Sequence, residues 1–502
     1  MMDIWSWICE LPDSTESDSP QIFELVNGGG DDSTRGIHVK AQRTAGSTSE
    51  ALLTLSICLN GFHPHIDGNT IWVSDTCPLK SDKPFLPLLL QLVQEIITRS
   101  PMAQTSTCPR SQFQKLKPDA VSWILDTHSP ESFSNLFNIV FLMRLFWLCV
   151  CDAPSEVGFF YFESLLGPYL EAMKLDQTTV LSTFFIAVGV DAELCFMRTF
   201  GYMLTKWLLL TPTYSGHQLR LSYATEANGF WVLKAYAPLL AMELSNNSSR
   251  NTNRDSVLNY ALAHQQLETV IQLEYSVTFH EGYLRVTARV DNLRFHVSKL
   301  GFSKKDEVDY ANERHFVSRA RIWVGPEVGA TYVSGLSLGR STNNGEREVE
   351  QQRVVKGSCE KLKAPKIKTR ARMGTRARIK NWRWDQDAEG NCVIFDAVLH
   401  DNSNGHEVAM WKRMSDGDEV RNQYNGPRRP FTKTRGLVFA GDEYGEGVEW
   451  RLSKEMEGNV LKWRIGGEVW VSYLPNQVKS TFSETRCVEW CDEVDLPLIP
   501  GK

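Results

Sequence analysis

One stretch of this sequence contains a serine between two glycines, an arrangement in which the serine could be catalytic. Residues 335–339 read GLSLG and match the pattern in which a serine, here Ser337, is exposed on a sharp turn as a nucleophile. That chemistry requires a strand before the serine, a helix after it, and an acid and a histidine later in the chain. The following residues, RSTNNGE, are typical of a loop, which favours a plain turn between strands. We therefore expect no catalytic residue, and Ser337 is the candidate if the protein is a serine hydrolase.

A second stretch has carboxylates at spacings that suit a metal ion. Asp385, Asp387, Glu389 and Asp396 follow the ligand spacing of a calcium-binding loop around Gly390. The match is incomplete, because the fifth position is Glu and the twelfth is Asp. The flanking residues alternate as in strands, whereas that calcium loop joins two helices. A turn rich in Asp and Gly is the better interpretation, and we expect no metal site.

The strongest signal of binding is a basic stretch, residues 353–383. It holds twelve Lys or Arg and one acid, Glu360, for a charge of +11 in a chain of net charge −6, so the other residues carry −17. Many of its cations are two residues apart, which is the spacing of a strand and not of a helix. The cations and two tryptophans that would bind a polyanion or a partner are Lys366, Lys368, Arg370, Arg372, Arg376, Arg378, Lys380, Trp382 and Trp384.

A hairpin turning at residues 372–374 would hide the apolar residues of this stretch. Its register sets basic residues opposite one another: Arg370 with Arg376, Lys368 with Arg378, and Lys366 with Lys380. Like charges in opposed positions destabilise a sheet, and a bound anion would relieve them. Nucleic acid, an anionic lipid headgroup or a nuclear-import receptor would each suit such a surface. The alternative is a charged patch without function, balanced by solvent or by acidic surface elsewhere in the chain.

Residues 81–213 have the pattern of packed helices. The segment SPESFSNLFNIVFLMRLFWLCVC offers Ser129 as the residue that caps a helix, with Pro130 at its first position. Two segments here are apolar enough to suggest a membrane, but charged residues interrupt them. We expect core helices and no transmembrane insertion, with Arg144, Glu193 and Arg198 paired or reaching solvent.

Residues 214–502 alternate as strands do. In VIQLEYSVTF the apolar residues from Ile271 to Phe279 fall on one face, and after the turn HEG the segment YLRVTARV alternates in the same way. Together these patterns predict an α+β protein: a small mixed segment over residues 1–80, a helical bundle over 81–213, and a large antiparallel β domain, a sandwich or an open barrel, over 214–502.

Two stretches carry a family resemblance. DIWSWICELP near the start and IWVGPEVGATYVSGLSLGRSTNN in the middle resemble a plant-specific family, some of whose members are labelled erythronate-4-phosphate dehydrogenase-like. That label implies an NAD-dependent dehydrogenase with a Rossmann domain. The sequence has no G-x-G-x-x-G fingerprint and no identifiable place for a His-Glu-Arg active site, so the resemblance transfers no catalytic residue.

These observations favour a non-enzymatic interaction protein that binds a polyanion or a protein partner through the β domain. The alternative is an enzyme, either the dehydrogenase that the label implies or a hydrolase using Ser337. We expect no cofactor, because no phosphate-cradling motif is found. Eleven cysteines without a C-x-x-C pair, and a start without the features of a signal peptide, predict a cytoplasmic or nuclear protein with reduced thiols.

Overall fold

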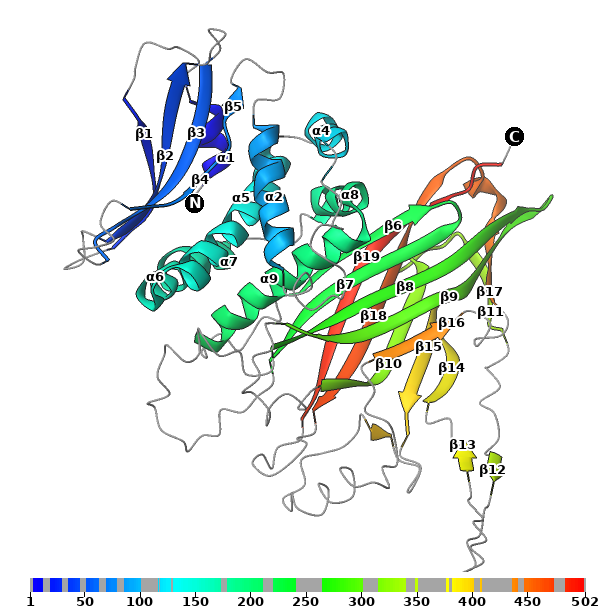
Figure 1. Ribbon diagram of the computed structural model, residues 1–502. Helices are drawn as coiled ribbons and strands as arrows, with labels where there is room; N and C mark the ends of the chain where they lie inside the picture. The colour runs from blue at the N-terminus through cyan, green and yellow to red at the C-terminus, as the bar shows by residue number, and fades with distance from the viewer. Residues whose placement is uncertain are drawn as a thin grey trace, which may run out of the picture. The chain divides into compact units, whose positions relative to one another are not determined.

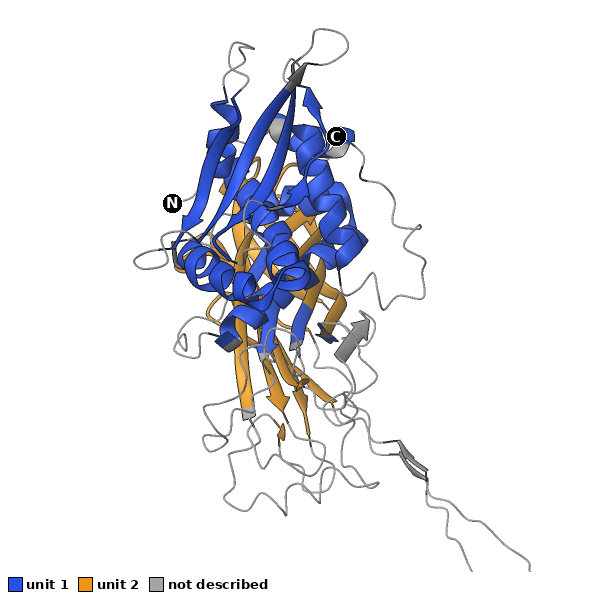
Figure 2. Cartoon of the chain, turned by 60° about the vertical axis from the view of Figure 1, so that its left-hand side comes forward, with its two compact units in different colours: residues 1–223, 235–268, 298–313 blue, residues 224–234, 269–297, 314–502 orange. Residues whose placement is uncertain are grey.

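The computed structural model, drawn as a ribbon in Figure 1, consists of two compact units, which Figure 2 shows in different colours. Unit 1 comprises residues 1–223, 235–268 and 298–313, and unit 2 comprises residues 224–234, 269–297 and 314–502. The structure describes residues 3–11, 19–28, 35–45, 51–62, 69–78, 85–100, 116, 118–127, 130–172, 178–210, 220–240, 264–300, 315–339, 348–350, 376–378, 382–400, 407–408, 436–440, 447–473 and 484–500. The described residues form helices and antiparallel sheets, which confirms the predicted α+β class.

The N-terminal part of unit 1 is a short helix and a small sheet. Helix α1 (Ile4–Cys9) is capped by Asp3, whose side chain accepts a hydrogen bond from the backbone of Ser6. The sheet runs in the order β1 (Gln21–Asn27), β2 (Gly36–Ala45), β3 (Ala51–Asn60) and β4 (Asn69–Val73), and β5 (Cys77–Pro78) also pairs with β3.

The helices of unit 1 share one apolar core. Helix α2 (Leu86–Arg99) has Pro87 in its first turn and buries Leu88, Leu92 and Ile96 on one face, because these residues recur every four positions. It packs against α5 (Pro130–Phe146) and α9 (Val190–Leu210). The remaining helices are α4 (Pro118–Thr127), α6 (Ser155–Phe160), α7 (Gly167–Ala172) and α8 (Thr178–Val188).

Two segments of this core wind as π-helices: η3 (Trp147–Asp152), which continues α5, and η4 (Tyr161–Leu166) between α6 and α7. Residues 133–152 are the one described helical segment long and apolar enough to cross a membrane, with a mean hydropathy of 1.7. The structure buries 94% of an 18-residue window of this segment, and a core helix of a soluble protein can be equally long and apolar.

Unit 2 is built on two antiparallel sheets. The five-stranded sheet has the order β14 (Trp382–Glu389), β15 (Cys392–Leu399), β10 (His315–Pro326), β18 (Val460–Tyr473) and β19 (Glu484–Pro497). The seven-stranded sheet has the order β11 (Val333–Ser337), β17 (Val448–Ser453), β9 (Tyr283–Lys299), β8 (His264–Phe279), β7 (Phe230–Leu240) and β6 (Leu221–Ala227), with β16 (Gly436–Ala440) beside β9. Strands β6 to β9 contribute residues to both units, and a short η7 (Lys454–Met456) follows β17.

The hairpin predicted from alternation is confirmed as β8 and β9. Ile271 and Leu273 are buried on β8, and Leu284 and Val286 are buried on β9. The inner faces of the two sheets meet at Trp463 on β18, whose ring stacks on Trp231 of β7 at 5.4 Å between centroids. Two packed antiparallel sheets agree with the predicted sandwich, whereas the Rossmann domain that the dehydrogenase label implies would need parallel strands.

Candidate functional site

Most of the basic stretch lies outside the described residues, including Lys366, Lys368, Arg370, Arg372 and Lys380. Of its described residues, Arg376–Arg378 form β13, which pairs with β12 (Glu348–Glu350). The register places Arg376 opposite Glu350 and Arg378 opposite Glu348. The partner strand found in the described part of the chain is therefore acidic, where the hairpin hypothesis required a basic one. An acidic neighbour is what the alternative without a bound anion predicts.

The two tryptophans expected to accompany the cations lie on β14. Their ring centroids are 6.3 Å apart. Trp382 is half-buried, and Trp384 is 8% exposed and belongs to the buried side of the strand. A ring that stacks on a base must be exposed, so the burial of Trp384 does not suit the stacking role expected of it.

The carboxylates of the calcium-like stretch lie on a β-hairpin. Strands β14 and β15 are joined by Gly390 and Asn391, and Gly390 has a φ of +62°, which favours glycine. Asp385 lies directly opposite Asp396, and Glu389 lies opposite Cys392. In the described parts of the chain no three His, Cys, Asp or Glu side chains are placed to hold a metal ion.

Ser337 is the last residue of β11, an edge strand, and it lies opposite Glu449 of β17. It is exposed, and the two described residues that follow it are not helical. A nucleophile elbow needs a helix at that point, so the local geometry around Ser337 is that of a strand end.

A line of charged residues crosses the outer face of the five-stranded sheet. The register aligns one residue from each strand: Asp385 on β14, Asp396 on β15, Arg321 on β10, Glu468 on β18 and Glu489 on β19. Directly opposed residues share a face of a sheet, so these five side chains cross the sheet as a single line. We call this line the charged row. It contains four carboxylates and one guanidinium.

Two arginines of β10 neutralise part of the charged row. Arg319, one position along the face, donates from Nε to Asp396 Oδ1 at 3.0 Å, and its Nη2 donates to Oδ2. This hydrogen bond raises the pKa of Arg319. Arg321 lies 3.7 Å from Asp396 and 3.9 Å from Glu468. Both oxygens of Asp396 therefore accept hydrogen bonds within the protein. The carboxylates of Asp385, Glu468 and Glu489 can still accept hydrogen bonds from a partner.

Tryptophans lie beside the charged row, and one of them contacts Arg319. The Arg319 guanidinium lies 4.9 Å from the centroid of the Trp470 ring. Trp323, two residues after Arg321, covers Gly466 of β18, where a Cβ would lie 2.5 Å from the ring. Arginine stacked on tryptophan loses little freedom when it makes further contacts, which is why both residue types are common where proteins bind one another.

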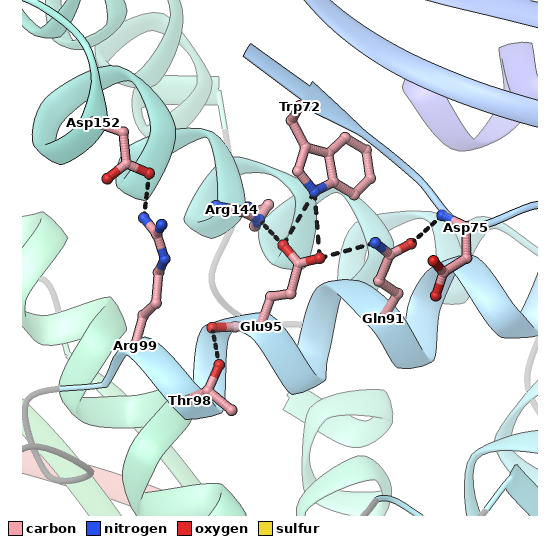
Figure 3. A network of polar contacts seen from close by, with 8 residues as sticks. All are labelled: Trp72, Asp75, Gln91, Glu95, Thr98, Arg99, Arg144 and Asp152. Carbon is pink, nitrogen blue, oxygen red and sulfur yellow. Dashed lines mark hydrogen bonds and ion pairs between the residues drawn. The ribbon is translucent and has the colours of Figure 1, made fainter. Parts of the chain in front are cut away.

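Unit 1 contains a separate polar network around Glu95 of α2 (Figure 3). The Glu95 carboxylate accepts hydrogen bonds from Trp72 Nε1 at 3.1 Å and from Gln91 Nε2 at 2.9 Å, and it forms an ion pair with Arg144. Arg144 comes from the apolar helix α5 and is 5% exposed, and burial lowers its pKa. Because Glu95 joins α2, α5 and β4, the network is a structural connection.

Two further charged residues of unit 1 lie on α9, Glu193 buried and Arg198 half-buried. Glu193 accepts hydrogen bonds from the hydroxyls of Tyr223 and Tyr236, and burial together with Glu193 raises the pKa of both tyrosines. Arg198 binds Glu268 through Nε at 2.7 Å and Nη2 at 3.0 Å. The prediction that Arg144, Glu193 and Arg198 are paired is confirmed.

The sequence analysis did not find the charged row. Its members come from five strands between residues 321 and 489, and only the register brings them together. A signal was present in FVSRARIWVG, where Arg319 and Arg321 occupy the polar positions of an alternating strand. Their acidic partners could not be assigned without knowing which strands are neighbours.

Comparisons with known proteins add little to this geometry. No protein-family model matches the chain, and no curated protein matches it. Among solved structures, the Clostridium perfringens delta-toxin is 8% identical over 56% of this chain and 89% of its own, with a TM-score of 0.21. The Clostridium perfringens NetB toxin in the membrane-inserted form is 8% identical over 55% of this chain and 100% of its own, with a TM-score of 0.19. Similarities at this level carry no argument about fold or function.

Proposed function

We propose that this protein is a non-enzymatic binding protein of the cytoplasm or nucleus. Its charged row in unit 2 contacts a basic segment of a protein partner. The observation that carries the proposal is the row itself, in which four carboxylates and one arginine cross five strands on one face. The row supports a partner that supplies positive charge.

The charged row works against the stability of its own sheet. Asp385 is directly opposite Asp396, and Glu468 is directly opposite Glu489, and opposed like charges cost up to about 1 kcal/mol a pair. Arg321 lies opposite Asp396 and Glu468 on their other side, so the members of the row without an oppositely charged neighbour in it are Asp385 and Glu489. Residues that break a local rule without a structural gain are expected at functional positions.

The side-chain face suits a partner better than the sheet edge does. Edge strand β14 exposes Arg383, Asp385, Asp387 and Glu389, and charged side chains on an edge discourage another strand from adding to it. The opposite face of the sheet is buried in the sandwich. Contact through the outer face also uses Arg319 and Trp470, which are already ordered by each other.

A polyanion is the other candidate, and it rests on the sequence of residues 353–383. Phosphates would be repelled by Asp385, Glu468 and Glu489, so the charged row does not support it. The two ligand classes therefore require different parts of unit 2, and one experiment separates them.

The test measures binding of two probes to the full chain: a fluorescent decalysine peptide and heparin. We expect decalysine to bind, and the double variant Glu468→Gln/Glu489→Gln to bind it about fivefold more weakly, since each exposed ion pair is worth about 0.5 kcal/mol. The control is Glu455→Gln/Glu457→Gln, which removes the same charge at η7, outside the charged row. Equal weakening in both double variants would show a nonspecific effect of net charge and would refute the proposal.

The alternatives have their own signatures. Heparin retention that falls steeply with salt, together with decalysine binding that the row variant does not change, would assign function to the basic stretch. Saturable enhancement of NADH fluorescence by the protein would support the dehydrogenase instead and would contradict a non-enzymatic role.

A further inference from the structure

A tryptophan beside the charged row, Trp323, rests on a glycine. Trp323 follows Arg321 by two positions on β10, so both side chains lie on the outer face of the five-stranded sheet. A Cβ built on Gly466 of β18, directly opposite Trp323, would lie 2.5 Å from Nε1 and Cε2 of the ring and 2.6 Å from Cζ2. A side chain at this position would therefore displace the ring. Because Trp323 is half-buried and its inner side rests on the glycine, its exposed part faces away from the sheet.

The other tryptophan near the row, Trp470, belongs to a complete group that binds an arginine. Trp470 lies directly opposite Arg319, whose guanidinium is 4.9 Å from the centroid of the ring. The same guanidinium donates to both oxygens of Asp396. At Trp323 the arrangement differs, because the directly opposed residues are Ile394 and the glycine under the ring, and both are uncharged.

Two carboxylates of the charged row lie on the same face as the Trp323 ring. Glu468 follows the glycine under the ring by two residues on β18, so it is a diagonal neighbour of Trp323. Glu489 of the edge strand β19 lies directly opposite Glu468 and is exposed. Arg321 is 3.9 Å from Glu468 on its other side, whereas the residue opposed to Glu489 in the row is the like-charged Glu468. A cation placed beside both carboxylates would relieve their opposition.

The chemistry of this place favours a guanidinium over an ammonium. A guanidinium is planar, so it can stack on an indole ring while its N–H groups point in its own plane toward carboxylates. An ammonium is a compact and strongly hydrated charge, so it can pair with the carboxylates but gains less from the ring. The combination of ring and carboxylates therefore discriminates between the two basic side chains.

We propose that Trp323 makes the partner surface of unit 2 selective for arginine. An arginine of the partner's basic segment stacks on the exposed side of the Trp323 ring, and its guanidinium pairs with Glu468 and Glu489. The inference rests on the proposed function, and it adds which basic residue the surface binds and which side chain selects it.

The test compares the binding of two fluorescent peptides of equal charge, decaarginine and decalysine, to the full chain. We expect decaarginine to bind about fourfold more tightly, the factor that one stacked cation gains at a solvent-exposed ring. Trp323→Leu should lower the affinity for decaarginine to about that for decalysine. Trp323→Phe, with a smaller ring, should reduce the ratio to about twofold, and it keeps the test decisive if Trp323→Leu fails to fold.

The matched control is Trp123→Leu, which removes an exposed tryptophan of α4 in unit 1 and should keep the fourfold ratio. Equal affinity of the unaltered protein for the two peptides would overturn the inference. A ratio that stays at fourfold in Trp323→Leu or in Trp323→Phe would overturn it as well.

Failure of this inference can be told apart from failure of the proposed function. If Glu468→Gln/Glu489→Gln weakens decalysine binding while the peptide ratio does not depend on Trp323, the partner surface stands and its selectivity for arginine is refuted. If that double variant binds both peptides as the unaltered protein does, the carboxylates are not a binding surface, and the proposed function and the inference are both refuted.

Discussion

At the scale of single residues, this protein places charges inside its core and pairs each with a specific neighbour. Arg144 is the clearest case, since it lies in the apolar helix α5 and reaches Glu95 on another helix. Removing one partner of a buried pair leaves the other charge without compensation, whereas removing both is often tolerated. This asymmetry distinguishes a structural pair from a surface contact.

We therefore predict that Glu95→Gln lowers the free energy of unfolding by about 3 kcal/mol, because Arg144 remains buried and charged. Arg144→Met should cost less, since Glu95 is 29% exposed and can be solvated. The double variant should be more stable than the sum of the two single changes implies. Chemical denaturation of the unaltered protein, the two single variants and the double variant gives the coupling free energy between Glu95 and Arg144. Additive effects would contradict the structural role of the pair.

His315 is predicted to make stability depend on pH. It is buried at the start of β10, and burial together with Arg486 lowers its pKa from 6.5 to about 3. The unfolded chain therefore binds a proton that the folded chain does not as pH falls from 6.5 toward 3, and stability is lost over that window. Over the whole window, the free energy of unfolding falls by on the order of 4 kcal/mol.

The check is denaturation of His315→Gln and of the unaltered protein between pH 7 and pH 4. The difference in stability between the two should shrink or reverse as pH falls. His280→Gln is the control, because His280 is a half-buried histidine next to the β8–β9 turn. Parallel curves for His315→Gln and the unaltered protein would contradict the prediction.

At the scale of the element, two glycines have different roles. Gly189 has a φ of +87° and separates α8 from α9, and no atom lies within 4 Å of the place where its Cβ would be. Gly466 lies within β18 with an ordinary φ, and a Cβ there would lie 2.5 Å from Trp323. The first position is restricted by the backbone and the second by packing.

Substitution by alanine should distinguish the backbone restriction at Gly189 from the packing restriction at Gly466. We expect Gly189→Ala to cost about 1 kcal/mol, and Gly189→Asn to cost less, because asparagine tolerates a positive φ. We expect Gly466→Ala to cost about 2 kcal/mol from overpacking, and to be partly rescued by Trp323→Leu. Thermal unfolding of these variants is the measurement, and failure of the Trp323 change to rescue Gly466→Ala would contradict the packing explanation.

At the scale of the whole molecule, unit 1 is not a continuous segment. The partners of Glu193 and Arg198 on α9 are Tyr223, Tyr236 and Glu268, all later than residue 213. The boundary at residue 213 suggested by sequence would cut α9 from these residues.

We predict that a fragment of residues 1–213 melts at least about 10 °C below the full chain, because it loses contacts worth several kcal/mol. It should also bind a dye that detects exposed apolar surface, since the described core of unit 1 includes Tyr223, Tyr236 and Leu300. Circular dichroism and dye fluorescence test both statements. A fragment that unfolds as sharply and at the same temperature as the full chain would contradict them.

The sequence by itself determined the class of the fold and the type of most elements. Local patterns sufficed: alternation predicted β8 and β9, Pro130 marked the start of α5, and charges in an apolar helix implied buried partners. Such patterns depend on neighbours in the chain, so they can be recognised without knowing the fold.

Only the tertiary structure decided which distant residues meet. The charged row depends on the register of five strands, and the close approach of Gln266 to Gly201 of α9 joins residues 65 positions apart in the chain. Register and helix packing are set by the summed burial of many side chains, and no local pattern encodes that sum. For the same reason the sequence suggested a basic strand as the partner of Arg376 and Arg378, whereas the structure places the acidic strand β12 opposite them.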